Sequence, residues 1–364
     1  MANKVLMKGN EALAEAAMRC GCRFFFGYPI TPQTELAAYM AKKMEKNGGT
    51  FLQAESEVAA INMVYGAAGA GARVMTSSSS PGISLKQEGI SYIAGADLPC
   101  LIVNIVRGGP GLGGIQPAQS DYFQATKGGG HGDYHLLVYA PSSVQELADL
   151  TSTAFDKADK YRMPAMIMGD GMLGQMMEPV EFKEYIDPES LPEKPWATTG
   201  TGMKRKKNIV NSLYLTPEEL ENLCIEREKR YNTIRETESL YEEINTEDAD
   251  LIIVAYGTIA RIAMSAVEEA RNNGLKVGLI RPITLWPFPA KVFEKRAETA
   301  KSFLCVVCTF CLYQRWQSMG QMIEDVKLSV NGKKPVYFYG RTGGMVPQQD
   351  AILEEIKKCL DANA

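Results

Sequence analysis

Short apolar runs alternate with longer helix-like stretches through the first half of the chain. The runs with the length and composition of strands cover residues 24–28, 50–53, 74–76, 98–106 and 165–168. The stretches 57–72 and 141–160 are helix-like, and the first of them is rich in Ala and Gly. Because strands that alternate with helices pair in parallel, this pattern predicts an α/β domain built on a parallel sheet.

The composition changes after residue 186. Residues 187–207 contain three prolines and end in the basic run 204–207, so we expect an exposed linker there. A long helix follows, in which Thr216 is the predicted cap, Pro217 suits the first turn and Glu219 completes a capping box. The residues that then fall on one face of this helix are Leu220, Leu223, Arg227, Tyr231 and Ile234.

A second α/β unit begins near residue 250. The pattern predicts a strand at 251–256, a turn at Gly257, a helix at 259–273 that Gly274 ends, and a returning strand at 277–280. Further strands are predicted at 303–307 and 336–339, and a closing helix at 351–359. We therefore predict a first domain over 1–186, a linker with a long helix over 187–247, and a second domain over 248–364.

Composition and charge exclude several classes of protein. The net charge of −4 argues against non-specific nucleic-acid binding, which needs a basic surface. No run of 18 apolar residues predicts a membrane span, and Glu11 and Glu15 interrupt the stretch that a secretory signal would need. Eight cysteines are too few for a disulfide scaffold in 364 residues. We expect reduced thiols and a cytoplasmic location.

Two local motifs are weak on inspection. Residues 109–114 satisfy G-x-G-x-x-G, but Pro110 and Pro117 oppose the helix that a dinucleotide site requires. His131 and His135 are the only histidines, and the glycines before them predict a loop rather than a helical metal site. No G-x-S-x-G elbow supports a serine hydrolase.

The cysteine run is a third weak motif. Cys305, Cys308 and Cys311 have the C-x₂-C-x₂-C spacing of a ferredoxin, but the fourth ligand position holds Arg315. Thiols in an apolar, strand-like stretch are more often small core residues. We therefore predict no metal site and no iron–sulfur cluster on this chain.

Four polar segments follow predicted strands, where open parallel sheets bind their ligands. They are GYPITPQTE at 27–35, QAESEVAA at 53–60, SSSSPGISL at 77–85 and NIVRGGP at 104–110. Together they resemble the 2-oxoacid:ferredoxin oxidoreductases, specifically the subunit that carries the pyrimidine-binding domain. The resemblance continues through 128–133, 169–175, 256–258 and 279–289, and it is greatest to the branched-chain (2-oxoisovalerate) type.

The resemblance implies a fold and a reaction. The fold would be a thiamine-diphosphate pyrimidine-binding domain with a parallel sheet, followed by a domain like the C-terminal domain of transketolase. The reaction would be oxidative decarboxylation of a 2-oxo acid to an acyl-CoA, with electrons passing through iron–sulfur clusters to ferredoxin. Either 2-oxoglutarate or pyruvate is an alternative substrate, and a non-catalytic scaffold subunit is an alternative of another class.

Roles for Glu57, Pro29 and Thr31 follow from matching the family pattern, and a role for Arg107 follows from its place at the end of the most apolar strand, before a glycine run. Glu57 would hydrogen-bond the pyrimidine ring of thiamine diphosphate and so activate the cofactor. Pro29 would approach the cofactor, while Thr31 and Arg107 would hold the substrate, since a guanidinium pairs well with a carboxylate. Each residue also has a purely structural alternative. Glu57 could simply favour the N-terminus of a helix, Pro29 and Thr31 could form a stiff turn, and Arg107 could make a structural ion pair.

The diphosphate half of the cofactor site is not encoded here. Gly169-Asp170-Gly171 opens the usual thiamine motif, but no Asn follows before Asn208. We therefore expect a partner beta subunit to anchor the diphosphate and its metal, and gamma and ferredoxin-like subunits to carry the clusters. One stretch, residues 308–317, departs from the family pattern.

Overall fold

The computed structural model describes residues 4–309 and 321–362, so most of the departing stretch 308–317 lies outside the described residues. Its largest sheet has seven strands in the order β12-β6-β7-β5-β4-β2-β3, all parallel except β12. In that order the strands are Thr284–Trp286, Leu137–Tyr139, Ala165–Asp170, Leu101–Val106, Val74–Ser78, Phe24–Gly27 and Thr50–Gln53. Every residue of β5 is buried, as expected for a strand that is apolar apart from Asn104 and has helices on both faces of its sheet. The predicted parallel sheet is confirmed.

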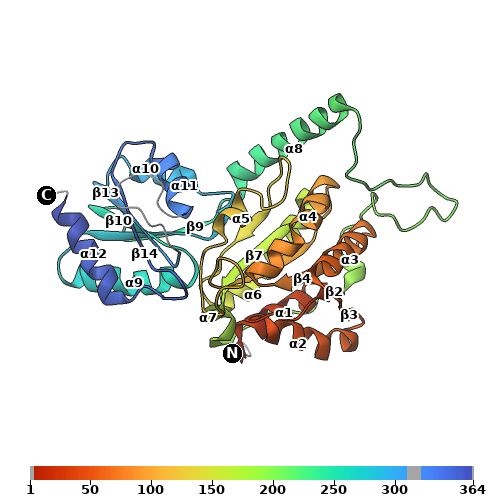
Figure 1. Ribbon diagram of the computed structural model, residues 1–364, viewed down its shortest axis with the longest axis horizontal. Coiled ribbons are helices and arrows are strands. Elements are labelled where there is room, and N and C mark those ends of the chain that lie inside the picture. Colours follow the sequence, from red (N-terminus) through yellow and green to blue (C-terminus); the bar gives the residue numbers. More distant parts are fainter. Residues whose placement is uncertain (1–3, 310–320, 363–364) are drawn as a thin grey trace.

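Helices cover both faces of this sheet (Figure 1). On one side, α3 (Glu57–Gly69) packs against α4 (Ser80–Gly95). On the other, α1 (Gly9–Arg19) packs against α2 (Thr34–Lys43) and α6 (Val144–Tyr161). A two-stranded sheet of β1 (Val5–Lys8) and β8 (Met177–Val180) lies beside α6. Because β2, β3, β4 and β5 are parallel, their carboxyl ends meet at one edge of the sheet.

The second α/β unit has a five-stranded sheet in the order β14-β13-β10-β11-β9, with only β9 antiparallel. The strands are Val336–Gly340, Ser302–Val307, Leu251–Val254, Val277–Pro282 and Tyr241–Ile244. Helices α9 (Gly257–Asn272) and α12 (Gln349–Asp361) cover one face, and α10 (Ala290–Arg296) and α11 (Gln321–Val330) cover the other (Figure 1). The predicted βαβ step is β10-α9-β11.

The two units are joined by more than the linker. Strand β12 comes from the second unit but pairs with β6 of the first sheet. Gln119 donates from its side chain to the carbonyl of Tyr256 at 2.9 Å and accepts from the amide of Cys308 at 2.9 Å. These contacts fix the second unit against the edge of the first.

The long helix α8 (Pro217–Thr237) forms as predicted, with Pro217 in its first turn. The capping box is wrong, because the Thr216 side chain makes no capping hydrogen bond. The predicted face is buried only in its second half, where Arg227, Tyr231 and Ile234 contact the body of the protein, whereas Leu220 is exposed. The first half of the helix projects beyond the sheet (Figure 1), which explains the difference. Within the described residues, no helix is long and apolar enough to cross a membrane.

Candidate active site at the carboxyl edge of the first sheet

Glu57 opens α3 just beyond the end of β3. Ser56 caps the helix, since its hydroxyl accepts a hydrogen bond from the amide of Ala59 at 3.1 Å. The cap fixes where the helix begins and therefore where the Glu57 side chain emerges. Glu57 is only 6% exposed, and no described side chain forms a hydrogen bond or ion pair with its carboxylate. A largely buried acid at the end of a parallel strand, whose carboxylate has no hydrogen-bonding side chain, is a candidate binding position.

Gly82, in the first turn of α4, makes room for that carboxylate. A Cβ atom at this position would lie 2.7 Å from Glu57 Oε1 and 2.1 Å from Ser78 Oγ. Both distances are shorter than any contact that a side chain tolerates. A larger residue here would therefore force the Ser78 and Glu57 side chains to move, and the SSSSPGISL segment has a glycine at this position.

Arg107 follows β5 and is 6% exposed. Its Nη1 donates to the main-chain oxygen of Thr31 at 3.0 Å, and its Nη2 donates to that of Leu112 at 2.9 Å. Ser80 holds the Arg107 backbone, since the serine hydroxyl accepts from the arginine amide at 3.0 Å and donates to its carbonyl at 3.2 Å. The structure thus brings two predicted substrate residues, Thr31 and Arg107, into direct contact.

The turn that contains Pro29 and Thr31 is held by a residue that sequence reasoning missed. Gln33 is fully buried, and its side-chain amide donates to the carbonyl of Tyr28 at 3.3 Å and accepts from the hydroxyl of Ser77 at 2.6 Å. Pro29 and Thr31 themselves are exposed. Gln33 stood within the matched segment, but nothing in the pattern separated it from its polar neighbours.

Several buried polar atoms at this edge have no hydrogen-bond partner among the described residues. They are Ser78 Oγ, Ser79 Oγ and Arg107 Nε. Buried polar atoms in proteins are nearly always paired, so a cluster of exceptions indicates where a ligand or water binds. Glu57 and Arg107 both adjoin the first turn of α4, through Gly82 and Ser80 respectively, so the cluster lies between an acid and a guanidinium.

Asp170, from the predicted Gly-Asp-Gly opening, has a different role. Its carboxylate accepts from the amides of Met172 at 2.9 Å and Leu173 at 3.0 Å, and from the hydroxyl of Thr258. It therefore caps the short helix α7 (Gly171–Gln175) and links it to α9. Burial raises the pKa of Asp170. Across the described part of the chain, no group of His, Cys, Asp or Glu could hold a metal ion.

The weak motifs adopt ordinary structural positions. His131 is exposed, while His135 stacks on Trp286 with ring centroids 4.5 Å apart, so the two imidazoles do not form a pair. Cys305 and Cys308 are buried and free, and burial raises the pKa of the Cys308 thiol to about 12. Such thiols stay protonated and do not readily bind metal. Cys311 lies outside the described residues.

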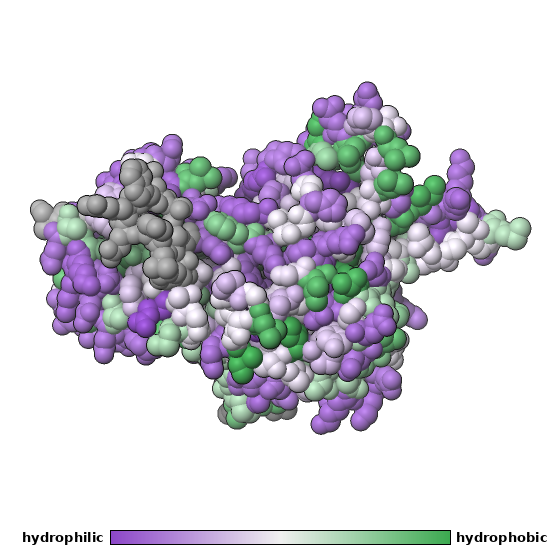
Figure 2. Space-filling model, viewed as in Figure 1, coloured by the Kyte–Doolittle hydropathy of each residue, from purple (hydrophilic) through white to green (hydrophobic). Residues whose placement is uncertain are grey.

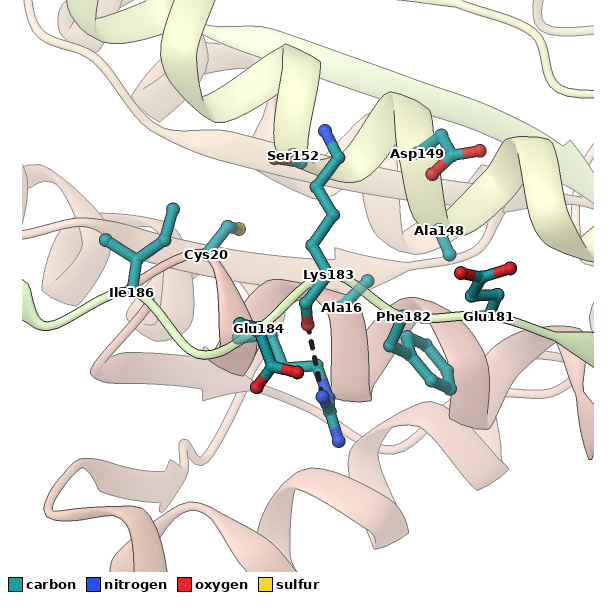
Figure 3. A pocket seen from close by; sticks show the side chains of 11 residues that line it. Ala16, Cys20, Ala148, Asp149, Ser152, Glu181, Phe182, Lys183, Glu184 and Ile186 are labelled. Atoms are coloured by element: carbon teal, nitrogen blue, oxygen red, sulfur yellow. Dashed lines mark hydrogen bonds between the residues drawn. The ribbon is translucent and has the colours of Figure 1, made fainter. Parts of the chain in front are cut away.

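The cavity in Figure 3 is not a ligand site. It lies between α1 and α6 beneath the segment that carries Phe182, away from the carboxyl edge of the sheet, with Arg19 bonded to the Lys183 carbonyl at 3.1 Å. Its volume of about 20 Å³ holds no more than one water molecule.

Comparison with known proteins agrees with this geometry. The family profile "Pyruvate flavodoxin/ferredoxin oxidoreductase, thiamine diP-bdg" matches residues 15–244, and "Pyruvate:ferredoxin oxidoreductase core domain II" matches residues 249–352. Ketoisovalerate oxidoreductase subunit VorB of Methanothermobacter marburgensis is 48% identical over 97% of each chain.

Two solved structures are also similar. The 2-oxoglutarate:ferredoxin oxidoreductase of Magnetococcus marinus has a TM-score of 0.85 and 28% identity, over 98% of this chain and 65% of that one. A split-gene transketolase has a TM-score of 0.58 at 12% identity, over 98% and 99% of the chains, and supports the predicted fold alone. The predicted fold and family are confirmed: the chain belongs to the 2-oxoacid:ferredoxin oxidoreductase family.

Proposed function

We propose that this chain is the pyrimidine-binding subunit of an enzyme that oxidises a branched-chain 2-oxo acid to its acyl-CoA and passes the electrons to ferredoxin. The observation that carries the proposal is the largely buried Glu57, whose carboxylate makes no hydrogen bond to a described side chain and which adjoins unpaired serine hydroxyls at the strand ends. The glycine at 82 that makes room for it supports a built site rather than an incidental one.

Glu57 would act on the thiamine diphosphate implied by the family. When bound, thiamine diphosphate supplies a nucleophilic carbon and an electron sink. Glu57 would hydrogen-bond the pyrimidine ring nitrogen and so favour the imino tautomer of the ring, whose exocyclic nitrogen is basic enough to take up a proton. The Ser56 cap and the Gly82 gap fix the carboxylate for that role, because a short, well-directed hydrogen bond needs a fixed acceptor. Pro29, on the neighbouring turn, would contact the cofactor.

Arg107 and Thr31 would hold the substrate. The Arg107 guanidinium keeps one buried nitrogen, Nε, without a partner, and its other two nitrogens are fixed by main-chain oxygens. An anchored guanidinium of this kind can donate hydrogen bonds to the carboxylate of a 2-oxo acid without having to reorganise. The exposed Thr31 side chain belongs to the same turn and would contact the other side of the substrate.

Partner subunits would complete the enzyme. The relative from Methanothermobacter is named as a subunit, and Asp170 is already fully engaged within this chain. A beta subunit would therefore bind the diphosphate and its metal, and gamma and ferredoxin-like subunits would carry the iron–sulfur clusters. Apolar side chains exposed on the linker and the start of α8 offer surface for such partners (Figure 2); they are Met203, Ile209, Leu213, Leu215 and Leu220. The division into 1–186, 187–247 and 248–364 is part of this proposal.

The branched-chain substrate is favoured by the comparison of relatives. Identity is 48% to the subunit of a ketoisovalerate enzyme and 28% to a 2-oxoglutarate enzyme. Hydrophobic pockets separate substrates that differ by one methylene by only about 1–3 kcal/mol, so substrate preference must be measured.

The test is ferredoxin reduction by the chain assembled with its partner subunits, with 3-methyl-2-oxobutanoate, 2-oxoglutarate or pyruvate as substrate. We expect the highest kcat/KM with the branched acid, and loss of thiamine-dependent turnover in Glu57→Gln. A higher kcat/KM with another acid would overturn only the proposed branched-chain substrate. Full activity in Glu57→Gln would overturn the proposed role of Glu57 in activating the cofactor. No turnover by a complete complex would overturn the proposal that the chain is part of an enzyme.

A further inference from the structure

Lys86 is the most unusual charged residue in the described part of the chain. It lies in α4, its side chain is fully buried, and its ammonium makes one long hydrogen bond, 3.4 Å to the main-chain oxygen of Glu57. Lysine is almost never fully buried without a partner, because moving an ammonium out of water is costly. A methionine has a similar length without the charge, so packing alone does not explain a lysine at this position.

The direction of Lys86 follows from helix geometry. Gly82, Lys86 and Gly89 are spaced by four and three residues, so they form one face of α4. That face meets α3: Gly82 lies against the Glu57 carboxylate, and a Cβ on Gly89 would lie 2.5 Å from Ile61 Cγ2. Lys86 therefore lies between two close contacts of α4 with α3, next to Glu57, the residue proposed to activate the cofactor.

Among the described residues, few charged side chains act on the Lys86 ammonium. Glu57 on α3 is the carboxylate that acts on it, and β5 carries no charged side chain. His131 faces Ser91 and Tyr92 elsewhere on α4, and Glu88 is bonded to Tyr92 at the exposed side. Burial lowers the pKa of Lys86 to about 8, and the Glu57 charge opposes that shift. At neutral pH the side chain is still mostly an ammonium.

We propose that Lys86 is a positioning residue that places a positive charge near the Glu57 carboxylate and fixes the first turn of α3 for cofactor binding. This inference rests on the proposed role of Glu57. A positive charge close to a carboxylate favours its ionised form, and the ionised form is the better hydrogen-bond acceptor. The hydrogen bond to the Glu57 carbonyl holds the backbone from which the carboxylate projects.

The experiment compares wild type, Lys86→Met, Lys86→Arg, Glu57→Gln and the Lys86→Met/Glu57→Gln double variant, each assembled with the partner subunits. In Lys86→Met we expect the acid-side midpoint of the kcat/KM profile to rise by about one pH unit. That shift corresponds to an about tenfold fall in kcat/KM at pH values well below both midpoints and to no change well above them, while KM for the 2-oxo acid stays within about twofold. Lys86→Arg should retain the wild-type midpoint, because it keeps the charge.

Binding of thiamine diphosphate, measured by calorimetry without substrate, supplies a second readout. Lys86→Met should weaken binding about tenfold in the wild-type background and by less than about twofold in the Glu57→Gln background, because the charge it removes acts through Glu57. A lysine that only fills space would weaken binding equally in both backgrounds, and that result would overturn the inference.

The two proposals fail in different ways. An unchanged pH profile in Lys86→Met together with an inactive Glu57→Gln would overturn the role of Lys86 and leave the proposed function in place. A fully active Glu57→Gln would overturn the proposed function itself. If Lys86→Met does not assemble, Lys86→Gln keeps a hydrogen-bond donor without the charge and should give the same shift in midpoint.

Discussion

Gly82→Ala should inactivate the enzyme while leaving it folded. The added methyl would lie 2.1 Å from Ser78 Oγ and 2.7 Å from Glu57 Oε1, with Glu57 Cγ at 3.1 Å. Ser78 can rotate away at little cost, because its hydroxyl has no partner to lose among the described residues. The backbone of Glu57 is fixed by the Ser56 cap, so only its side chain can give way. The carboxylate must therefore move.

The size of the movement sets the effect. Ordinary contacts begin near 3.4 Å, so the 2.7 Å contact requires a shift of about 0.7 Å. A displacement of about 1 Å at a reacting group costs about 10²-fold in rate, so we expect kcat to fall about 30- to 100-fold. Overpacking costs about 1–3 kcal/mol, and replacing a helical glycine returns up to about 1 kcal/mol. The free energy of unfolding should therefore change by no more than about 2 kcal/mol.

Gly66→Ala in α3 is the matched control. It makes the same change in a neighbouring helix, but a Cβ there meets nothing within 4 Å. We expect full activity and a gain of up to about 1 kcal/mol in stability. The assay is ferredoxin reduction by the assembled complex, with the unfolding temperature measured in parallel. Full activity in Gly82→Ala would refute the reasoning, since it would mean that the position of the Glu57 carboxylate does not matter.

Three further changes test other parts of the structure. Arg107→Lys should raise KM for the 2-oxo acid about 10- to 100-fold in steady-state assays, because one ammonium cannot replace two guanidinium nitrogens that are each fixed at a main-chain carbonyl. An unchanged KM would exclude substrate binding by Arg107. Thr258→Val should lower the free energy of unfolding by about 1–3 kcal/mol in denaturant melts, because Asp170 loses a buried donor, and no loss would contradict that linkage. Burial, with a smaller contribution from Arg235, lowers the pKa of His135 to about 4, so the unfolded chain takes up a proton near pH 6.5 before the folded one does. Stability should therefore fall by about 2 kcal/mol, discounted for partial exposure, as the pH drops from about 6.5 to 4. His135→Gln should remove that dependence in thermal melts.

The regular elements were predictable because their apolar patterns are strong. Residues 101–106 are apolar apart from Asn104, and they form a strand buried along its whole length. Short strands at the edges were not predictable in the same way. Strand β12, at Thr284–Trp286, pairs with a strand that lies more than 140 residues earlier in the chain. Local composition carries no signal for such a pairing, because its stability comes from contacts between the two units.

Three of the four candidate site residues were found through motif resemblance and Arg107 through its place after an apolar strand, and the structure adds how three of the four are connected. Arg107 and Thr31 share a hydrogen bond, and Glu57 joins them through the first turn of α4. Lys86 and Gln33 were missed for a physical reason. A lysine or glutamine in a polar segment is normally exposed, and only the packing of α3 on α4 buries the first of them.

The contrast between Asp170 and the serine hydroxyls at the carboxyl edge of the sheet shows what makes a strand-end polar group available to a ligand. Both lie at the carboxyl ends of buried parallel strands, and a motif search would favour the aspartate. Yet the Asp170 carboxylate already accepts three hydrogen bonds, two of them from the helix it caps, whereas Ser78 and Ser79 have none among the described residues. If this carboxylate bound a metal ion instead, α7 would lose its cap and the hydrogen bond to Thr258 in the second unit would break. Unpaired hydroxyls gain by binding, so the partners a group already has, rather than its motif, decide where the ligand goes.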